Sequence, residues 1–387
     1  MNVLMIGIGD AGLDDPRGEP VLRHLDYARR AGGHIDLIVD SPAGGESDYG
    51  ALTVRRTGTD RAFFPAAAYR LARRAAEKNP PDVITTQDPF ATGLAGLWVH
   101  GALRRPWIVQ NHSCILFNPH WIAERPMAFR GLHWLARWLL PHADAWRVVN
   151  TNERRIYVER LGLPADRVRV LPVPSDLEPF AAERTAGSAA RARESLRLPP
   201  GGPLVAWAGR PVRFKRLPVL FRAFAEIRDA FPGARLVIAG RKELAREDLD
   251  RAAESNGIAR SVIWSGELDR AGLAGLFHAA DVYLHSSIYE GFGRVLVEAG
   301  AAGLPAVSTA TAGATDILRD GETGFLTPLE DAPALARRAR AVLSDAALRA
   351  RMGAASRTRI RAEFDPQKLS EAVVAQWRDA ASAGVRS

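Results

Sequence analysis

The chain has 387 residues, enough for about two domains of ordinary size. Hydrophobic residues make up 47% and charged residues 25%, as in soluble globular proteins, and no apolar run reaches the ~18–20 residues of a membrane-spanning helix. The net charge of +8 favours anionic partners such as nucleotide diphosphates or anionic membrane surfaces. The basic residues are dispersed, without a nucleic-acid-binding motif, and the single Cys114 excludes an internal disulfide and fits a reducing cytoplasm.

Short apolar runs in the first half of the chain alternate with segments of helical periodicity, which predicts an α/β domain with a parallel sheet. We expect strands at residues 3–8, 35–39, 83–86, 107–110 and 145–149. The first run is short and no basic region precedes it, so it is not a signal peptide and is expected to be the first buried strand.

Proline and glycine then interrupt the pattern, and a second α/β series follows. The expected strands of this series are 204–208, 235–239, 262–264, 282–285 and 306–308. We predict an N-terminal domain at 1–175, a linker at 176–202 and a C-terminal domain at 203–366. A last helical segment lies within 367–387.

A glycine-rich loop follows the first expected strand and matches the dinucleotide-binding fingerprint, with Gly7, Gly9 and Gly12 in the required spacing. The fingerprint requires a helix to open at its last glycine. Here Pro16 and Pro20 intervene, so the helix is expected to begin near Pro20. NAD binding is therefore a distant alternative.

The most informative stretch covers about fifty residues of the second half. An expected strand leads into a loop holding Glu290, Gly291, Phe292 and Gly293, and a helical segment carrying Glu298 follows. Two glycines let a backbone approach a ligand closely, and a helix N-terminus after such a loop attracts phosphate. An acid one turn into the helix can accept hydrogen bonds from ribose hydroxyls. This pattern predicts a nucleotide carrying a second hydroxylated group.

This stretch closely resembles the donor-binding region of retaining glycosyltransferases of family 4. Glu290 and Glu298 stand eight positions apart around the glycine pair, and the series continues with Gly303-Leu304-Pro305 and then 320–325. The resemblance implies the GT-B fold, in which two Rossmann-like doubly wound domains face a central cleft. The first domain would then hold the acceptor and the second the nucleotide-sugar donor. The resemblance also implies that the last helical segment, within 367–387, returns to complete the first domain.

Two cations after the first strand of the second domain are assigned by the same resemblance. Arg210, next to Gly209, and Lys215 would neutralise the leaving diphosphate. Lys215 is one of only four lysines in an arginine-rich chain. The family more often carries glycine where Arg216 stands, which puts the geometry of this loop in question.

The resemblance also assigns the donor ligands. Glu298 would bind the ribose and Glu290 the hydroxyls of the donor sugar. Backbone amides from Gly291 to Val295 would hold sugar hydroxyls and phosphate oxygens. Arg294 stands where the family commonly has an apolar residue, and it would either reach the phosphates or point to solvent.

Candidates in the first domain are fewer. His112 follows the expected strand 107–110, where its family counterpart touches the donor sugar and could donate to a hydroxyl or carry developing charge. Gly18, with Arg23 nearby, would lie over the donor phosphates. The remaining histidines of this region are interpreted as surface or packing residues: His120, His133 and His142.

Together these residues predict a retaining, hexosyltransferase-like enzyme that moves a sugar from a nucleotide diphosphate sugar to an acceptor hydroxyl in polysaccharide, glycolipid or glycoside biosynthesis. No carboxylate pair or His/Cys cluster has metal-ligand spacing, so neither a metal nor another cofactor is expected. Two alternatives stay open: another sugar-nucleotide enzyme of this fold, an epimerase or hydrolase, or a non-catalytic nucleotide-sugar-binding subunit.

A basic and aromatic stretch at 121–140 allows two interpretations. Trp134, Arg137 and Trp138 fall on one helical face, which would be an ordinary core-facing helix or a surface resting on a membrane. Basic residues upstream would extend such a surface: Arg70, Arg73 and Arg74. In the second case the cytoplasmic protein would be peripheral at the inner face of the membrane, and its acceptor would be lipid-linked.

Overall fold

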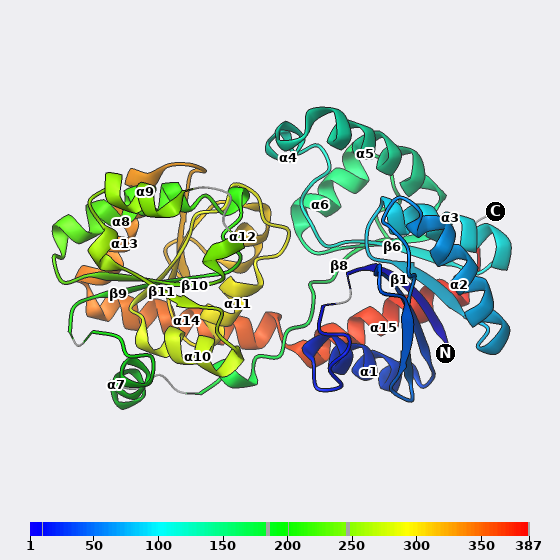
Figure 1. Cartoon of the computed structure of the whole chain (residues 1–387), viewed down its shortest axis with the longest axis horizontal. Coiled ribbons are helices and arrows are strands. Elements are labelled where there is room, and N and C mark those ends of the chain that lie inside the picture. The colour runs from blue at the N-terminus through cyan, green and yellow to red at the C-terminus, as the bar shows by residue number, and fades with distance from the viewer. Residues whose placement is uncertain (10, 183–185, 200, 245–247, 386–387) are drawn as a thin grey trace. The chain divides into compact units, whose positions relative to one another are not determined.

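The computed structural model describes residues 1–9, 11–182, 186–199, 201–244 and 248–385. The chain divides into two units, one of Met1–Pro174 with Pro366–Ser387 and one of Ser175–Asp365. Each unit is a mostly parallel sheet covered by helices on both faces (Figure 1). Among the described residues, no helix combines the length and apolar character needed to cross a bilayer.

The first unit contains an eight-stranded sheet in the order β3-β4-β2-β1-β5-β6-β7-β8. All neighbouring strands pair in parallel except β3, which runs antiparallel to β4. The strands are β1 (Val3–Ile8), β2 (Ile35–Asp40), β3 (Gly45–Asp48), β4 (Leu52–Arg56), β5 (Val83–Thr86), β6 (Trp107–Asn111), β7 (Ala145–Val148) and β8 (Val168–Val170).

Both faces of this sheet are covered, because successive residues of a strand point to opposite sides. In β1, Leu4 and Ile6 pack under α2, α3 and α5, whereas Val3 and Met5 pack against α1 and α15. The helices of this unit are α1 (Glu19–Ala31), α2 (Phe64–Lys78), α3 (Ala91–Leu103), α4 (Pro119–Glu124), α5 (Pro126–Leu139), α6 (Thr151–Arg155) and α15 (Pro366–Ala383), with short turns η1 (Leu140–His142) and η2 (Ile156–Arg160).

The last helix, α15, is part of the core of the first unit. Its Trp377 is fully buried, with its ring centroid 5.4 Å from that of Tyr27 on α1. Gln376 Nε2 donates to the carbonyl oxygen of Trp146 at 2.9 Å. The C-terminal residues therefore complete a domain that begins with the first strand.

The second unit contains a six-stranded, fully parallel sheet in the order β11-β10-β9-β12-β13-β14. Its strands are β9 (Leu204–Ala208), β10 (Arg235–Ala239), β11 (Val262–Gly266), β12 (Val282–His285), β13 (Ala306–Thr309) and β14 (Gly324–Thr327). The strand order reverses at β9, which lies between β10 and β12. In open α/β sheets, ligands bind beyond the carboxyl ends of the strands at such a reversal.

Helices cover both faces of this second sheet as well. They are α7 (Ala186–Ser195), α8 (Leu217–Ala230), α9 (Leu249–Ser255), α10 (Arg270–Ala279), α11 (Arg294–Ala301), α12 (Ala312–Ile317), α13 (Ala332–Ser344) and α14 (Ala346–Glu363), with short turns η3 (Glu178–Phe180), η4 (Arg213–Lys215), η5 (Lys242–Leu244) and η6 (Ala259–Ser261). Buried residues of α8 and α13 pack against β9, β10 and β12 in a single core.

All ten strands expected from apolar runs are present, within two residues at each end. Four further strands, β3, β4, β8 and β14, were missed. β3 is a largely exposed polar edge strand and β8 has only three residues, so neither produces an apolar run. The expected linker 176–202 holds α7, which packs against α10 in the second unit, although 183–185 and 200 lie outside the described residues.

Replacing Trp377 with alanine is expected to destabilise the first unit by about 3–5 kcal/mol, because it empties a fully buried indole site. Urea unfolding monitored by circular dichroism would measure the loss. The exposed Ser382→Ala on the same helix should change the free energy of unfolding by less than about 0.5 kcal/mol. Equal effects of the two substitutions would contradict the core role of α15.

Candidate functional site

A cavity of about 420 Å³ lies in the second unit, at the carboxyl ends of β9, β10 and β11 and beside the first turns of α11. It occupies the reversal point of the sheet, as the strand order predicts. Five residues expected from the sequence line it: Gly209, Arg210, Arg294, Val295 and Glu298. The segments following β10 and β11 also contribute to its wall.

Four arginines surround this cavity, which makes it suited to an anion. Arg241 forms an ion pair with Glu267, while Arg270 and Arg294 face Glu298. In the part of the chain that the structure describes, the guanidinium of Arg210 has no ion-pair partner. Arg210 is therefore the cation that an entering ligand can engage without breaking an existing pair.

Glu298 lies on α11 and is 1% exposed, although it borders the cavity. Arg270 Nη1 lies 3.2 Å and Arg294 Nε 3.5 Å from Glu298 Oε1. Arg270 also donates to the carbonyl oxygen of Asp176 and lies 5.2 Å from the centre of the Phe180 ring. These contacts fix the carboxylate and show that Arg294 turns toward Glu298. No motif in the sequence pointed to Arg270.

Lys215, Glu290 and His285 form a second cluster. Lys215 Nζ pairs with the Glu290 carboxylate, and His285 Nε2 lies 3.5 Å from Glu290 Oε2. Burial raises the pKa of Glu290, but Lys215 and His285 together outweigh it, so the pKa falls to about 2. Burial lowers the pKa of His285, whose Nδ1 lies 3.0 Å from Ser308 Oγ. Glu290 is thus ionised and held between an ammonium and a neutral imidazole.

Three contacts tie the loop after β9 to the loop after β12. Ser286 Oγ donates to the carbonyl oxygen of Lys215 at 2.7 Å, and Ile288 N donates to that of Phe214 at 2.9 Å. The rings of Phe214 and Tyr289 stack with centroids 4.7 Å apart. Each aromatic residue immediately precedes a member of the ion pair. This adjacency is visible in the sequence, but the sequence-based prediction did not use it.

The glycine loop at 291–293 packs closely against the backbone at Gly313. Gly293 has φ of 87°, a conformation that glycine adopts readily, and it caps the start of α11. Gly313 N donates to the carbonyl oxygen of Glu290 at 3.1 Å. A side chain at Gly313 would collide, because its Cβ would lie 2.2 Å from the carbonyl oxygen of Phe292.

Arg216 occupies the position where the resembled family more often has glycine. Its φ is 52°, so this backbone uses the left-handed conformation that glycine would favour. The side chain forms an ion pair with Glu330, whose φ of 63° is also left-handed. The loop geometry therefore suits glycine, and arginine is accommodated there at some cost in strain.

His112 belongs to the first unit and follows β6. Its Nε2 lies 3.0 Å from Gln110 Oε1, which also accepts from Arg147 Nη1 at 2.8 Å. Because that amide oxygen only accepts, His112 Nε2 carries the proton and Nδ1 is left as an acceptor. Burial lowers the pKa of His112 to about 3, with Arg147 adding to the effect. The imidazole is therefore suited to accept from a hydroxyl rather than to carry charge.

Gly18, also in the first unit, immediately precedes α1. A Cβ there would lie 2.4 Å from the carbonyl oxygen of Gly12, so packing of the loop requires glycine. Since α1 begins at Glu19, no helix opens at Gly12 as the dinucleotide fingerprint requires. Arg23 pairs with Glu19 at 3.6 Å. The other three histidines are packing or surface residues, as expected: His120, His133 and His142.

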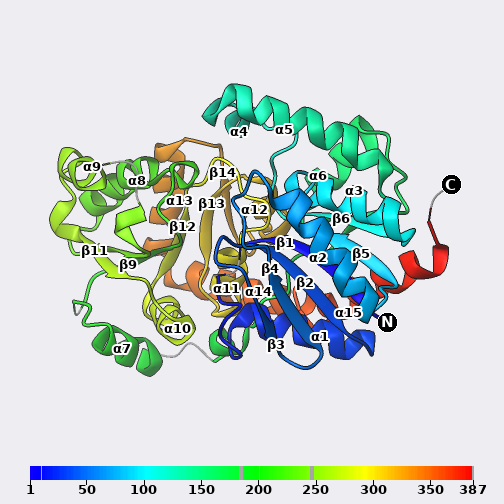
Figure 2. The ribbon, with the colours of Figure 1, turned by 45° about the vertical axis from the view of Figure 1, so that its right-hand side comes forward.

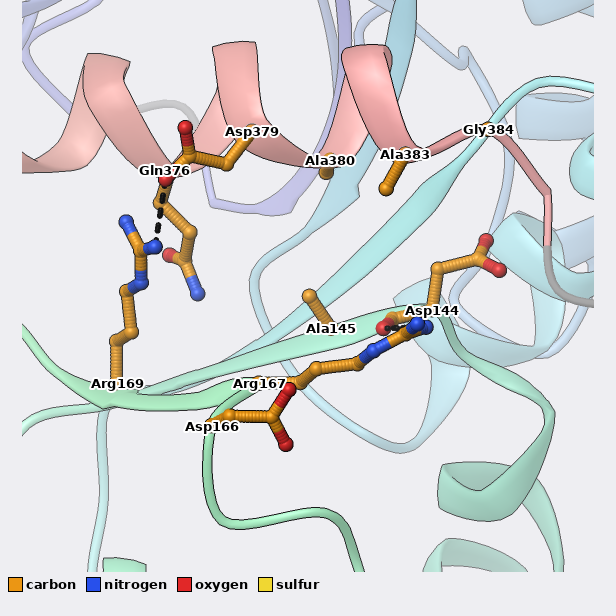
Figure 3. Close-up of a pocket in the computed structure, with 10 residues that line it drawn as sticks. All are labelled: Asp144, Ala145, Asp166, Arg167, Arg169, Gln376, Asp379, Ala380, Ala383 and Gly384. Carbon is orange, nitrogen blue, oxygen red and sulfur yellow. Dashed lines mark hydrogen bonds and ion pairs between the residues drawn. The ribbon is translucent and has the colours of Figure 1, made fainter.

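A second cavity, of about 280 Å³, lies in the first unit between the starts of β7 and β8 and the C-terminal half of α15 (Figure 3). Arg169 and Asp379 pair across it at 2.5 Å, and Arg167 Nη1 lies 3.5 Å from the carbonyl oxygen of Asp144. This cavity opens at the amino ends of the strands and contains no residue expected from the sequence. Within the described ranges, no group of three or more His, Cys, Asp or Glu side chains could hold a metal ion.

Two family comparisons together cover most of the chain. Residues 188–359 match the family described as "Glycosyl transferases group 1", and residues 19–174 match a "Glycosyl transferase 4-like domain". D-inositol 3-phosphate glycosyltransferase of Corynebacterium jeikeium is 31% identical over 311 residues, 77% of this chain and 72% of that protein. Glycogen synthase of Mycobacterium tuberculosis is 28% identical over 87% of this chain and 73% of its own length.

Other relatives match over less of their length. The D-inositol 3-phosphate glycosyltransferase of Nocardia farcinica is 35% identical, but the match spans 49% of this chain and 42% of the relative. Among solved structures, sucrose-phosphate synthase from Thermosynechococcus elongatus has a TM-score of 0.82 at 23% identity, covering 98% of this chain and 100% of the other. Anabaena HepE in complex with UDP-glucose has a TM-score of 0.75 at 18% identity, covering 98% and 99%. These structures share the fold of this chain.

Replacing Lys215 with methionine is expected to lower the free energy of unfolding at pH 7 by roughly 2 kcal/mol, because it leaves the partly buried Glu290 carboxylate without its cation. The wild-type pKa of about 2, against an ordinary 4.5, means that the pair stabilises the fold fully above pH 4.5 and loses this effect as pH falls toward 2. The deficit of the variant should therefore shrink in acid. Chemical denaturation across this pH range would measure it.

The double variant Lys215→Met/Glu290→Gln is the matched control. It removes the unpaired charge, so it should recover part of the lost stability at pH 7. A deficit that is the same at pH 7 and pH 3, and that Glu290→Gln does not reduce, would assign the effect to lost packing around Lys215.

Proposed function

The chain belongs to the group 1 glycosyltransferases with a GT-B fold, and on this premise we propose that it transfers a sugar from a nucleotide diphosphate sugar to an acceptor hydroxyl with retention of anomeric configuration. The observation that carries the proposal is the cavity at the carboxyl ends of β9–β11. It combines the unpaired Arg210 with the buried, anchored Glu298. The single buried thiol, Cys114, fits a reducing cytoplasm as the compartment of this reaction.

The donor is proposed to lie with its base between the segments that follow β10 and β11, which reach the cavity wall at Gly240 and Glu267. Glu298 would accept from the ribose hydroxyls, in place of part of its contact with Arg270 or Arg294. The first turn of α11, with Val295 at the cavity, would face the phosphates. A similar fold, that of HepE, holds UDP-glucose, so uridine donors are the first to test.

Arg210 and Lys215 are proposed to stabilise the departing diphosphate. Lys215 has three N–H donors, so its contact with Glu290 leaves others available for a phosphate oxygen. In the step, the bond between the anomeric carbon and the diphosphate oxygen breaks, and the acceptor oxygen bonds to the same face of that carbon. The acceptor proton passes to the leaving phosphate oxygen, so no enzymic base is required.

Glu290, in the second unit, is proposed to orient the donor sugar, and His112, in the first unit, is proposed to contact a substrate hydroxyl. Glu290 is ionised and restrained by Lys215 and His285, so it suits a fixed acceptor for sugar hydroxyls rather than a nucleophile. His112 Nδ1 would accept from a further hydroxyl. We propose that no metal is needed, because cationic side chains supply the charge that a divalent ion would supply.

Binding of a nucleoside diphosphate is the first test. We expect UDP, or else GDP or ADP, to raise the melting temperature in thermal shift, with EDTA making no difference and NAD having no effect. Glu298→Ala should abolish the shift. Glu226→Ala removes an exposed acid of α8 that does not line the cavity and serves as the matched control, with the shift kept. A shift with NAD alone, or one indifferent to Glu298, would refute the donor site.

Turnover tests the chemistry separately. Arg210→Ala should lower kcat about 10²–10³-fold while donor binding changes far less, because the lost cation acts mainly on developing charge. Product anomeric configuration by NMR would report retention or inversion. Donor consumption without any acceptor would favour the epimerase or hydrolase alternative. Binding without turnover on any acceptor would favour the non-catalytic subunit.

A further inference from the structure

The first unit carries three helices, α2, α3 and α5, on one face of its sheet (Figure 2). Their buried residues pack on the strands in a single core, so their other sides face away from the sheet. We call these sides the outer face of the α2–α3–α5 layer. On the opposite side of the sheet, α1 and α15 pack beside each other in a second core.

Large apolar side chains gather on this outer face. On α5, Met127 is 91% exposed, Trp134 65% and Trp138 56%, and their spacing of seven and four residues places them in one stripe. Trp98 on α3 is exposed as well, and so is Phe63, next to the start of α2. Five of the eight exposed large apolar side chains in the described residues therefore belong to this layer.

The same three helices carry many more cations than acids. The three helices contain six Lys or Arg residues and a single acid, Glu77. Among the described residues, five of the cations have no ion-pair partner: Arg70, Arg73, Arg74, Lys78 and Arg130. The sixth, Arg137, lies 4.9 Å from the centre of the Trp134 ring and so places its charge beside the apolar stripe.

The opposite helix layer has the usual composition of a solvated surface. Helices α1 and α15 together contain five basic and four acidic residues. Their cations mostly pair locally, as Arg29 does with Asp26 at 2.6 Å and Arg378 with Glu371 at 3.1 Å. The unbalanced charge and the exposed tryptophans thus belong to one side of the unit, rather than to its surface in general.

We propose that the outer face of the α2–α3–α5 layer docks on an anionic lipid bilayer. Trp134, Trp138 and Met127 would enter the headgroup and upper acyl region, where tryptophan is favoured. The arginines of α2 and α5 would lie over anionic headgroups. This docking concerns the first unit alone and does not depend on the proposed sugar transfer.

The apolar stripe decides between possible occupants. A nucleic acid would use the cations but would leave the exposed side chains of Met127, Trp134 and Trp138 without an apolar partner. A second copy of this chain would bring the same positive charge against itself, and like charges oppose such a contact. A bilayer satisfies both sets of side chains at once.

Vesicle co-sedimentation of the full chain tests the proposal. We expect binding to vesicles of equal phosphatidylcholine and phosphatidylglycerol, and little binding to phosphatidylcholine alone. Arg73→Gln/Arg74→Gln should weaken binding about fivefold per arginine, about 25-fold together, at low ionic strength. Trp134→Ser/Trp138→Ser should weaken vesicle binding about tenfold or more. The same variant should reduce the blue shift of tryptophan fluorescence that accompanies binding.

Matched variants on the opposite layer serve as controls. Arg29→Gln/Arg378→Gln makes the same change in net charge, and Leu22→Ser removes an exposed apolar side chain of α1, 53% exposed. Neither should change binding more than about twofold, and circular dichroism would verify folding of all variants. The proposal would be overturned if the wild type did not bind the anionic vesicles, or if the control variants lost as much vesicle binding as the test variants. It would also be overturned if the wild type formed a dimer that Trp134→Ser/Trp138→Ser abolished.

Discussion

The ion pair between Lys215 and Glu290 is the constraint on which the second unit's site depends. It connects the loop after β9 with the loop after β12, and these strands are neighbours at the centre of the sheet. Both side chains are partly buried, so the pair is costly to form because each charge loses part of its water. The backbone hydrogen bonds and the aromatic stack beside it hold both loops in place, so the desolvated charges need no rearrangement to meet a ligand.

The arrangement also explains why two acids of the same motif behave differently. Glu290 faces an ammonium and a neutral imidazole, which hold it as a fixed anion in a partly buried position. Glu298 faces two guanidinium groups, one of which is also held by a backbone carbonyl and the Phe180 ring. Glu290 is therefore held by residues at the ends of strands, and Glu298 is held in part by Arg270 of helix α10.

The sequence predicts the chain's regular elements well, because buried parallel strands produce continuous apolar runs such as 204–208. It also singles out Glu290 and Glu298 through the glycine pair and the spacing of the two acids, whereas Arg210 and Lys215 were assigned by the family resemblance; the roles of all four in donor binding stay predictions. It misses His285 and Arg270, whose importance arises from contacts between residues far apart in the chain. Exposure is equally hard to predict. Helical periodicity placed Trp134 and Trp138 on one face, but only the fold shows that this face is exposed rather than packed in the core.

The return of α15 to the first unit has a consequence for biosynthesis. The residues from Ser175 to Asp365 leave the ribosome as one continuous stretch that contains its whole sheet and core. The first unit lacks Trp377 and its neighbours until the whole of the second unit has been synthesised. The usual order, in which an N-terminal domain matures first, is therefore reversed here. During elongation, the face of the first sheet that α15 covers stays exposed beside α1. A chaperone that binds nascent chains would bind the apolar residues of this face.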